Sequence, residues 1–324
     1  MKGAAVCLVL ALGCIAPDAA RPADAGFPNK PIRFIVPLPV GSVPDLRARQ
    51  LGQRMTLTLG QTIVVDNRPG AGSNLGAALA AKAAPDGYTI LLGNLGVFAI
   101  NPALYGKLPF DPVKDFEPIC LAFTAPFAVM INPALPARSV GELIALANAR
   151  PGELTYASLG SGTLAHLGAE LFKDVARVDV RHIPYREYAV LTGDLMSGRV
   201  DMFFDSLVVM SPHAKSGRVR ALAVSGNARL PAFPELPTFA EAGLPAYEMQ
   251  AWTGVAAPAH TPPAIIARLN AALNEALQQQ DVREANLAVG SFALGGTPQE
   301  FAARIRADQS RWAKIVARTG AKVE

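Results

Sequence analysis

The sequence predicts an α/β protein with two lobes, each built on a mainly parallel sheet flanked by helices. Short β-branched runs alternate with amphipathic helical segments from residue 26 onward, and this alternation is typical of α/β folds. It occurs in two successive rounds, and a helical tail follows the second round. In sheets of this kind ligands bind at the carboxyl ends of the strands, so we expect the site in the loops that follow strands.

The first round opens with a β-branched strand at residues 32–36, followed by a Pro/Gly turn and a helix over about 44–59. Leu51, Met55 and Leu59 recur every four residues and mark the buried face of that helix. The remaining predicted elements of this round are a strand at 62–65, a helix at 74–83 and a strand at 88–92.

The second round begins near residue 127. Residues 119–131 form an apolar run that Pro126 divides, which predicts two buried strands. Ser139 and Glu142 have the spacing of a capping box, which predicts a helix over 143–149. The other predicted elements are strands at 155–158, 180–183, 202–204 and 221–224 and a helix marked by Leu164, Leu167 and Leu171.

The end of the chain is predicted to be helical. Thr261 precedes Pro262, the pattern of an N-cap followed by proline at the first helical position, and apolar residues then recur every four positions from Ile265 to Leu277. Thr297 and Glu300 form a second capping-box pattern, which opens the last helix.

The first 25 residues have the features of a signal peptide. Lys2 supplies a positive charge, residues 4–16 are apolar but too few to span a bilayer, and small residues precede a cleavage site after Ala25. We therefore expect the protein to be exported. A lipoprotein anchored at Cys14 is the less favoured alternative, because residues 11–14 make a poor lipobox. Cleavage leaves Cys120 as a single cysteine, so no intrachain disulfide can form.

Composition excludes several other classes of function. The formal net charge is +4, and no basic cluster interleaved with aromatics occurs, so nucleic acid is not an expected partner. His166 and Glu170 lie four residues apart without a third ligand, which favours a polar helix face over a metal site. Cys120 lies in an apolar run that disfavours its thiolate. We expect no metal, no cofactor and no catalytic activity, since no nucleophile–base pair can be assembled from the sequence.

Four loops between strands and helices carry donors suited to an anion. The first spans residues 37–45 and includes Gly41 and Ser42, and the third spans 158–163 with three hydroxyls and two glycines. The second contains Gly70 and Gly72, but its spacing is wrong for a dinucleotide fingerprint and it has no phosphate-loop ending. The fourth is residues 204–206.

Eight segments in order resemble the Bug family of periplasmic solute-binding proteins, the receptors of tripartite tricarboxylate transporters. They are residues 31–37 (PIRFIVP), 65–72 (VDNRPGAG), 84–89 (APDGYT), 101–105 (NPALY), 110–116 (FDPVKDF), 182–185 (HIPY), 220–224 (RALAV) and 237–243 (PTFAEAG). The resemblance covers nearly all of the chain after the signal.

The resemblance implies a Venus-flytrap fold whose lobe 1 comprises residues 26–126 and 247–324 and whose lobe 2 comprises 127–246. It implies hinge strands near 123–127 and 245–252, and a carboxylate held in the cleft by the first and third loops through backbone N–H groups, hydroxyls and water. Family ligands include amino acids, di- and tricarboxylates and aromatic acids. The loops and the resemblance together give these candidate ligand-binding residues: Leu38, Pro39, Gly41, Ser42, Val43, Asp45, Gly72, Asn94, Ser158, Gly160, Ser161, Gly162, Thr163, Tyr185 and Asp205.

Departures from the family pattern leave the ligand's identity open. The family's first loop reads PFPPGGSTD, whereas residues 37–45 read PLPVGSVPD and so exchange two hydroxyl positions for one at Ser42. Ser161 and Ser206 stand where asparagine is common. Glu187 replaces a glycine and would disfavour a second ligand carboxylate if it faces the cleft. Asp45 is expected either to accept a ligand ammonium or, more simply, to place favourable charge in a helix first turn.

These observations predict a monomeric receptor that delivers a small carboxylate to the membrane subunits of a tripartite tricarboxylate-type transporter. Two alternatives stay open at this point. One is a receptor of the same fold that passes its closed form to a signalling partner. The other is a secreted hydrolase, which would require a nucleophile–base pair.

Overall fold

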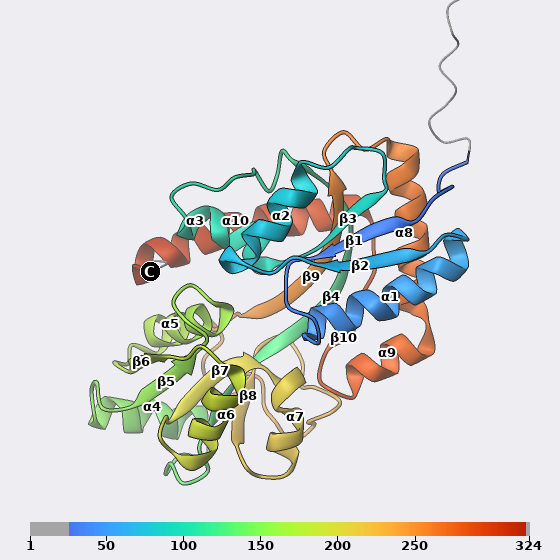
Figure 1. Cartoon of the computed structure of the whole chain (residues 1–324). Coiled ribbons are helices and arrows are strands. Elements are labelled where there is room, and N and C mark those ends of the chain that lie inside the picture. The colour runs from blue at the N-terminus through green and yellow to red at the C-terminus, as the bar shows by residue number, and fades with distance from the viewer. Residues whose placement is uncertain (1–25, 322–324) are drawn as a thin grey trace, which may run out of the picture.

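The computed structural model describes residues 26–321, and its strands form one sheet that runs through both lobes (Figure 1). The strand order along the sheet is β2-β1-β3-β9-β4-β7-β5-β6, and β8 and β10 also pair with β4. The strands are β1 (Ile32–Val36), β2 (Ile63–Asn67), β3 (Thr89–Asn94), β4 (Phe116–Ile131), β5 (Thr155–Ser158), β6 (Arg181–Pro184), β7 (Met202–Ser206), β8 (Arg220–Val224), β9 (Gln250–Pro258) and β10 (Phe292–Ala293).

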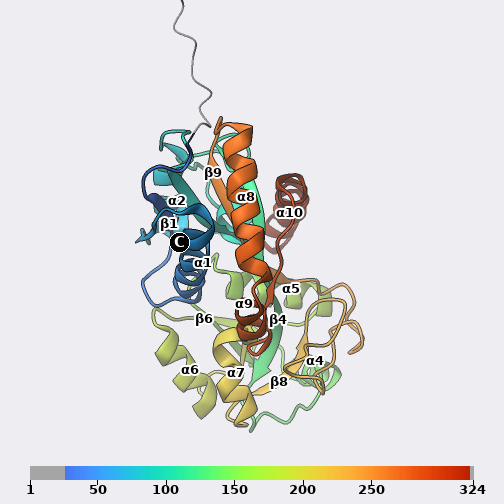
Figure 2. The same ribbon diagram turned by 90° about the vertical axis from the view of Figure 1, so that its right-hand side faces the viewer.

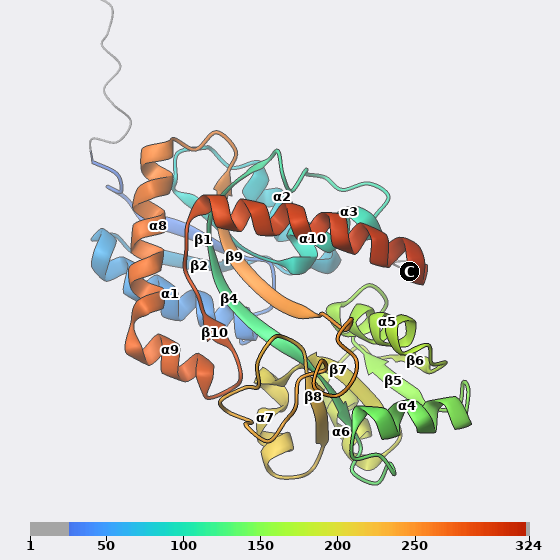
Figure 3. The same cartoon turned by 180° about the vertical axis from the view of Figure 1, so that it is seen from behind.

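Helices cover the sheet in both lobes. Those around β1, β2, β3 and β9 are α1 (Val43–Leu59), α2 (Asn74–Ala81), α3 (Asn101–Leu104), α8 (Pro263–Gln278), α9 (Gln280–Leu287) and α10 (Pro298–Thr319). Those around β5 to β8 are α4 (Val140–Ala149), α5 (Leu164–Ala176), α6 (Tyr188–Ser197) and α7 (Leu207–Lys215). Figure 2 shows α8 lying along β9 and β4, with α10 beside it. From behind, α10 runs across lobe 1 toward α5 of lobe 2 (Figure 3), where Arg318 pairs with Asp174 at 2.6 Å.

The two-lobed α/β fold predicted from the sequence is confirmed, but the sheet is mixed rather than mainly parallel. Parallel pairing is confined to β1 with β2 and β3, and to β5 with β6 and β7. The strands that connect the lobes pair antiparallel, because β9 lies between β3 and β4 and β4 also pairs with β7 and β8. The lobe boundaries at residues 126 and 247 stay a prediction.

The apolar run at residues 119–131 forms one strand, so the prediction of two strands was wrong. Pro126 lies at the position where β4 changes partners: it is the last residue to pair with β9, opposite Gln250, and Phe127 begins the pairing with β7, opposite Ser206. The Phe127 N–H donates to the Ser225 hydroxyl at 2.8 Å. A proline is tolerated here because its missing N–H falls at the end of one ladder.

Two of the three predicted helix caps form as expected. Thr297 and Glu300 make the full capping box of α10. The Ser139 hydroxyl caps α4 by accepting from the Glu142 N–H, although the Glu142 carboxylate accepts from Arg138 rather than from Ser139. Thr261 is not an N-cap. Its hydroxyl donates to the Pro258 carbonyl at 2.7 Å, and α8 begins one residue later than predicted.

The predicted signal peptide and cleavage site lie outside the described residues. Within residues 26–321, no helix is both long and apolar enough to cross a membrane. The Cys120 thiol is buried in β4, and that burial raises its pKa to about 12, as its apolar surroundings predicted.

Candidate functional site

The predicted loops leave their strands at the carboxyl ends, at one edge of each parallel unit. In lobe 1, Val36 pairs with Asn67 and Ile35 with Leu91, so the loops after β1, β2 and β3 emerge side by side. In lobe 2, Ala157 pairs with Ile183 and Phe203, which places the ends of β5, β6 and β7 together. The connection from β1 to α1 lies on the side of lobe 1 that faces lobe 2 (Figure 1).

The first loop is held by bonds within lobe 1. The Gly41 N–H donates to the Asp45 carboxylate at 2.8 Å, and Gly41 adopts a positive φ of 80° that favours glycine. The Ser42 hydroxyl and N–H both donate to the Pro39 carbonyl, so Ser42 does not cap α1 through its side chain. The Leu38 carbonyl accepts from the Asn67 amide at 3.0 Å. Val43 is the first residue of α1.

Asp45 is 1% exposed and forms an ion pair with Arg49 at 3.0 Å. Burial favours its neutral form, but the hydrogen bonds from Arg49, Gly41 and Asn67 outweigh burial and hold its pKa below the ordinary value. Its carboxylate is therefore ionised. Oδ2 accepts from the Gly41 N–H and from Arg49, whereas the buried Oδ1 has the ion pair with Arg49 but no hydrogen bond. Of its two expected roles, the structure favours the helix-terminal one over capture of a ligand ammonium.

Gly72 and Asn94, which stand beside the first loop in lobe 1, have structural partners. The Gly72 carbonyl accepts from Asn101. A Cβ at Gly72 would displace the Tyr105 hydroxyl, and the positive φ of 61° also favours glycine at this position. The Asn94 side-chain oxygen accepts from the Val97 N–H at 2.9 Å, which stabilises the turn after β3.

The third loop is organised by Ser158, the last residue of β5, which is fully buried. Its hydroxyl accepts from the Gly160 N–H at 3.0 Å and lies 2.6 Å from Nε2 of His182 on β6. The Thr163 hydroxyl donates to the Gly160 carbonyl and accepts from the His166 N–H, which makes Thr163 the N-cap of α5. Gly160 and Gly162 both have positive φ.

His166 lies inside lobe 2, so the expectation of a polar helix face was wrong. Its side chain is buried, and its Nδ1 accepts from the Gly162 N–H at 3.1 Å. Its ring centroid lies 4.5 Å from that of His182. Glu170 accepts instead from the Tyr156 hydroxyl and from Lys173. Among residues 26–321 no group of three His, Cys, Asp or Glu side chains is placed to hold a metal ion.

Ser161 differs from its neighbours in the third loop. In the part of the chain that the structure describes, neither its hydroxyl nor its N–H has a hydrogen-bond partner, whereas the N–H groups of Gly160, Gly162 and Thr163 all have one. Ser161 lies two residues before Thr163, the N-cap of α5, near the helix end where unpaired N–H groups and the helix dipole favour an anion. Ser161 is therefore the donor of this loop that is available to a ligand.

Tyr185, Asp205 and Glu187 occupy three different environments at the same edge of lobe 2. The Tyr185 hydroxyl donates to Asp194 on α6. The Asp205 carboxylate accepts from the Ser206 N–H, and burial raises its pKa to about 7. Glu187 is exposed and is the N-cap residue of α6 without a side-chain bond, so its side chain gives no indication of a ligand.

Ser158 and His182 form the serine–histidine pair that the sequence did not reveal. The register of β5 and β6, with Tyr156 opposite His182, brings together residues 24 positions apart. The pair lacks the features of a nucleophile and its base. Ser158 is fully buried, and its hydroxyl oxygen is already bonded to both the N–H and the carbonyl of Gly160. Burial and the neighbouring His166 lower the pKa of His182 to about 4.

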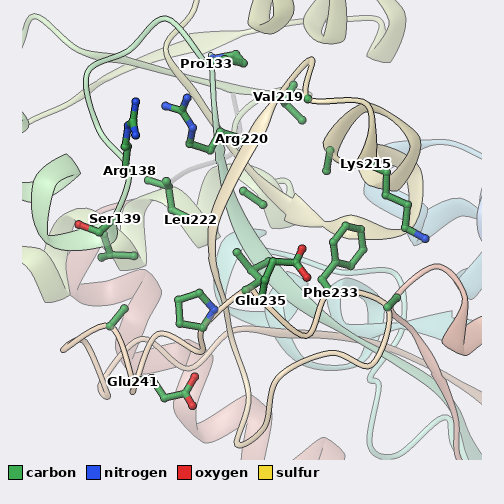
Figure 4. A pocket seen from close by; sticks show the side chains of 18 of the residues that line it. Pro133, Arg138, Ser139, Lys215, Val219, Arg220, Leu222, Phe233, Glu235 and Glu241 are labelled. Carbon is green, nitrogen blue, oxygen red and sulfur yellow. The ribbon is translucent and has the colours of Figure 1, made fainter.

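A cavity of about 840 Å³ lies elsewhere in lobe 2 (Figure 4). It is lined by the start of α4, by β8 and by residues 232–242, and it contains none of the predicted site residues. Its charges are mixed, and three of them already have partners: Arg220 donates to the Ala137 carbonyl, Lys215 donates to the Ala288 carbonyl, and Glu241 pairs with Arg229. We do not assign the ligand site to this cavity.

The sheet has two lobes with connecting strands between them, and donor loops at the strand ends face one another. This arrangement defines the class of periplasmic binding proteins. Residues 47–321 match the model of the tripartite tricarboxylate transporter family receptor. The chain belongs to that family, as the sequence resemblance predicted.

Relatives and solved structures agree with this assignment. The chain is 38% identical to protein BugT of Bordetella pertussis over 299 residues, 92% of each chain. It is similar to an R. palustris protein solved with adipate, with a TM-score of 0.83 and 34% identity over 92% of this chain and 100% of the other. It is also similar to MatC from Rhodopseudomonas palustris with bound malate, with a TM-score of 0.79 and 33% identity over 90% of this chain and 100% of MatC.

Proposed function

We propose that this protein is exported to the periplasm, where it captures a small carboxylate between its lobes and delivers it, as a monomer, to the membrane subunits of a tripartite tricarboxylate-type transporter. The main support for this proposal comes from the third loop. There Ser161 presents a hydroxyl and an N–H without protein partners, close to the N-terminus of the 13-residue helix α5. Hydrogen-bond donors at a helix N-terminus suit a carboxylate without requiring a formal cation.

The comparisons support the ligand class. Two structures that resemble this chain at 33–34% identity contain adipate and malate, both of which are carboxylates. Glycine at positions 41, 160 and 162, each with positive φ, allows a ligand to approach the backbone closely. No hydrogen bond or ion pair joins the first loop to the third within residues 26–321, so a ligand bound by both would bridge these two loops.

A thermal-shift screen against mono-, di- and tricarboxylates, amino acids and aromatic acids tests the proposal. A ligand that binds only the native state raises the melting temperature in proportion to the logarithm of its concentration above Kd.

Ser161→Ala is expected to weaken carboxylate binding about tenfold, the effect of about one hydrogen bond to a charged group, without changing the melting temperature of the free protein. Ser216→Ala is the matched control, since Ser216 is exposed and its hydroxyl donates only to the His213 carbonyl. Lack of response to every carboxylate would contradict the proposal.

The two alternatives give different results. A hydrolase that used Ser158 and His182 would turn over an ester or amide and lose that activity in Ser158→Ala. A receptor that feeds a signalling partner would bind the same carboxylate, but its deletion would leave uptake of the labelled ligand unchanged. Loss of uptake on deletion supports delivery to a transporter.

A further inference from the structure

Two arginines in the first half of α1 have opposite electrostatic situations. Arg49 pairs with Asp45 at 3.0 Å and also donates to the Asn67 side chain. Arg47 has no carboxylate within ion-pair distance among residues 26–321. Its guanidinium donates to the Ser291 hydroxyl at 2.5 Å and lies over the Phe123 ring, with its central carbon 4.6 Å from the ring centroid. The helix therefore carries one positive charge that no acid of the described chain neutralises.

Arg47 lies where lobe 1 meets lobe 2. Phe123 is on β4, four residues before that strand begins to pair with lobe 2. Ser291 bonds to the Thr124 carbonyl, and a Cβ on the adjacent Gly290 would lie 3.9 Å from Leu207, the first residue of α7. Long side chains on a helix lean toward its N-terminus, which for Arg47 is the end that carries the first loop. The guanidinium thus lies at the junction of the lobes, on a residue that follows the first loop by two positions.

The charge of Arg47 is retained despite its surroundings. Burial lowers its pKa to about 10, which leaves the side chain protonated at neutral pH. A guanidinium has five N–H donors in a planar fork, and Ser291 is the one hydrogen-bond partner of this group in the described chain. A partly buried cation without a counter-charge is costly unless another group compensates it, and the aromatic face of Phe123 compensates only in part.

We propose that Arg47 binds the second carboxylate of a dicarboxylate ligand whose first carboxylate is held at Ser161 in the third loop. This inference rests on the proposed function and adds the ligand's class to it. A guanidinium matches a carboxylate in charge and in planar, two-point geometry. With one carboxylate held on lobe 2 and the other on lobe 1, the ligand would add a link between the lobes to the Arg318–Asp174 ion pair. Glu187 was expected to disfavour a second ligand carboxylate if it faced the cleft. It is exposed at the N-cap of α6 in lobe 2 and has no bond to Arg47, so it does not occupy the guanidinium.

Isothermal titration with matched ligand pairs tests the inference. The probes are adipate against hexanoate and succinate against butyrate, which differ within each pair by one carboxylate. The wild-type protein is expected to bind a dicarboxylate at least about tenfold more tightly than its partner, the effect of one charge-assisted contact. Arg47→Met is expected to lower dicarboxylate affinity about 10- to 100-fold and to leave monocarboxylate affinity within about threefold. Arg47→Lys, which keeps the charge but not the fork, is expected to retain part of the preference.

Arg54→Met is the matched control, because Arg54 is on the same helix but is exposed and paired with Asp281. It should change neither affinity. Arg47→Gln, whose side-chain amide can still donate to Ser291, takes the place of Arg47→Met if that variant fails to fold, and the same loss of preference is expected.

Three results would overturn the inference. An unchanged ratio of dicarboxylate to monocarboxylate affinity in the Arg47 variants would remove Arg47 from the ligand site while the proposed function stands. An equal fall in both affinities would show that Arg47 acts on lobe closure, for example by pairing with Asp205, and not on the second carboxylate. Binding of no carboxylate by the wild-type protein would contradict the proposed function together with this inference.

Discussion

The loop from β1 to α1 in lobe 1 and the loop from β5 to α5 in lobe 2 occupy equivalent places in their lobes. In each, a glycine N–H donates to a side chain four residues further on: Gly41 to the carboxylate of Asp45, and Gly162 to the imidazole of His166. The carboxylate is charged and is held by Arg49. The imidazole accepts only when its Nδ1 is unprotonated. The same backbone geometry is therefore fixed by an ion pair in one lobe and by a neutral ring in the other.

The largest expected effect comes from removing the charged anchor. Asp45→Ala leaves the Gly41 N–H and Arg49 without their acceptor and should lower the free energy of unfolding by about 3 kcal/mol, the upper range for hydrogen bonds to a buried charged group. Urea unfolding measures this. Asp45→Asn keeps an acceptor oxygen and should cost less. Asp281→Ala is the control, because it breaks an exposed pair with Arg54 and should cost under about 0.5 kcal/mol. An equal loss of unfolding free energy in Asp45→Ala and Asp281→Ala would show that Asp45 does not anchor the loop.

Acid should weaken lobe 2 through His182, whose ring lies against that of the anchor His166. The native pKa of His182, about 4, lies below its ordinary value of 6.5, so the unfolded chain binds more protons between these pH values. The free energy of unfolding therefore falls as pH drops from about 6.5 to 4, and below that window the contribution of the neutral His182 is fully lost. We expect a contribution on the order of 1 kcal/mol, because His182 is only partly buried. The charged and titratable groups around it are His166, Tyr156, Glu170 and Lys173.

Urea unfolding of the wild type and of His182→Gln across pH 4–7 isolates this contribution. Asp205 works in the opposite sense, because its raised native pKa of about 7 makes the native state bind more protons and lose stability as pH rises from 3.8 to 7. The Asp205 contribution is present in both proteins and cancels in their difference. A difference that does not change with pH would refute the assignment to His182.

The smallest expected effect is seen when the residues that precede α1 and α5 are each changed to alanine. The Thr163 hydroxyl caps α5 through a long 3.4 Å bond from the His166 N–H, so Thr163→Ala should cost about 0.5 kcal/mol. The Ser42 hydroxyl repeats a bond that its own N–H already makes to Pro39, so Ser42→Ala should be within about 0.2 kcal/mol of the wild type. Thermal unfolding resolves the two, and a larger loss in Ser42→Ala would reverse the comparison.

Local patterns predicted most elements of the fold. β-branched runs marked β1 and β2, and the Thr297 capping box marked the start of α10, because these signals depend on neighbouring residues only. Long-range pairing was not predictable in the same way. Nothing near residue 250 indicates that β9 lies between β3 and β4, since that position is decided by strands more than 110 residues away.

The candidate site shows the same difference between features that depend on local sequence and features that depend on long-range pairing. Its loops could be located because they follow strands and are rich in glycine and hydroxyls. The bond between Ser158 and His182 depends on the register of β5 with β6 and could not be read from spacing. One local signal was overlooked: in both loops an acceptor side chain stands four residues after a glycine, at Asp45 and at His166. Arg47 was missed because only the structure shows that Arg49, and not Arg47, takes the one nearby acid.

The position of β9 has a consequence for the order in which the molecule can form during synthesis. β9 fills the space between β3 and β4, yet it is made after both of them and after the whole of lobe 2. Until residue 258 has been added, β3 and the first half of β4 each lack a neighbour, and open strand edges of this kind readily pair with other chains. Lobe 2 has all of its strands once β8 has been made, before β9 is added. Lobe 1 is therefore started first and completed last.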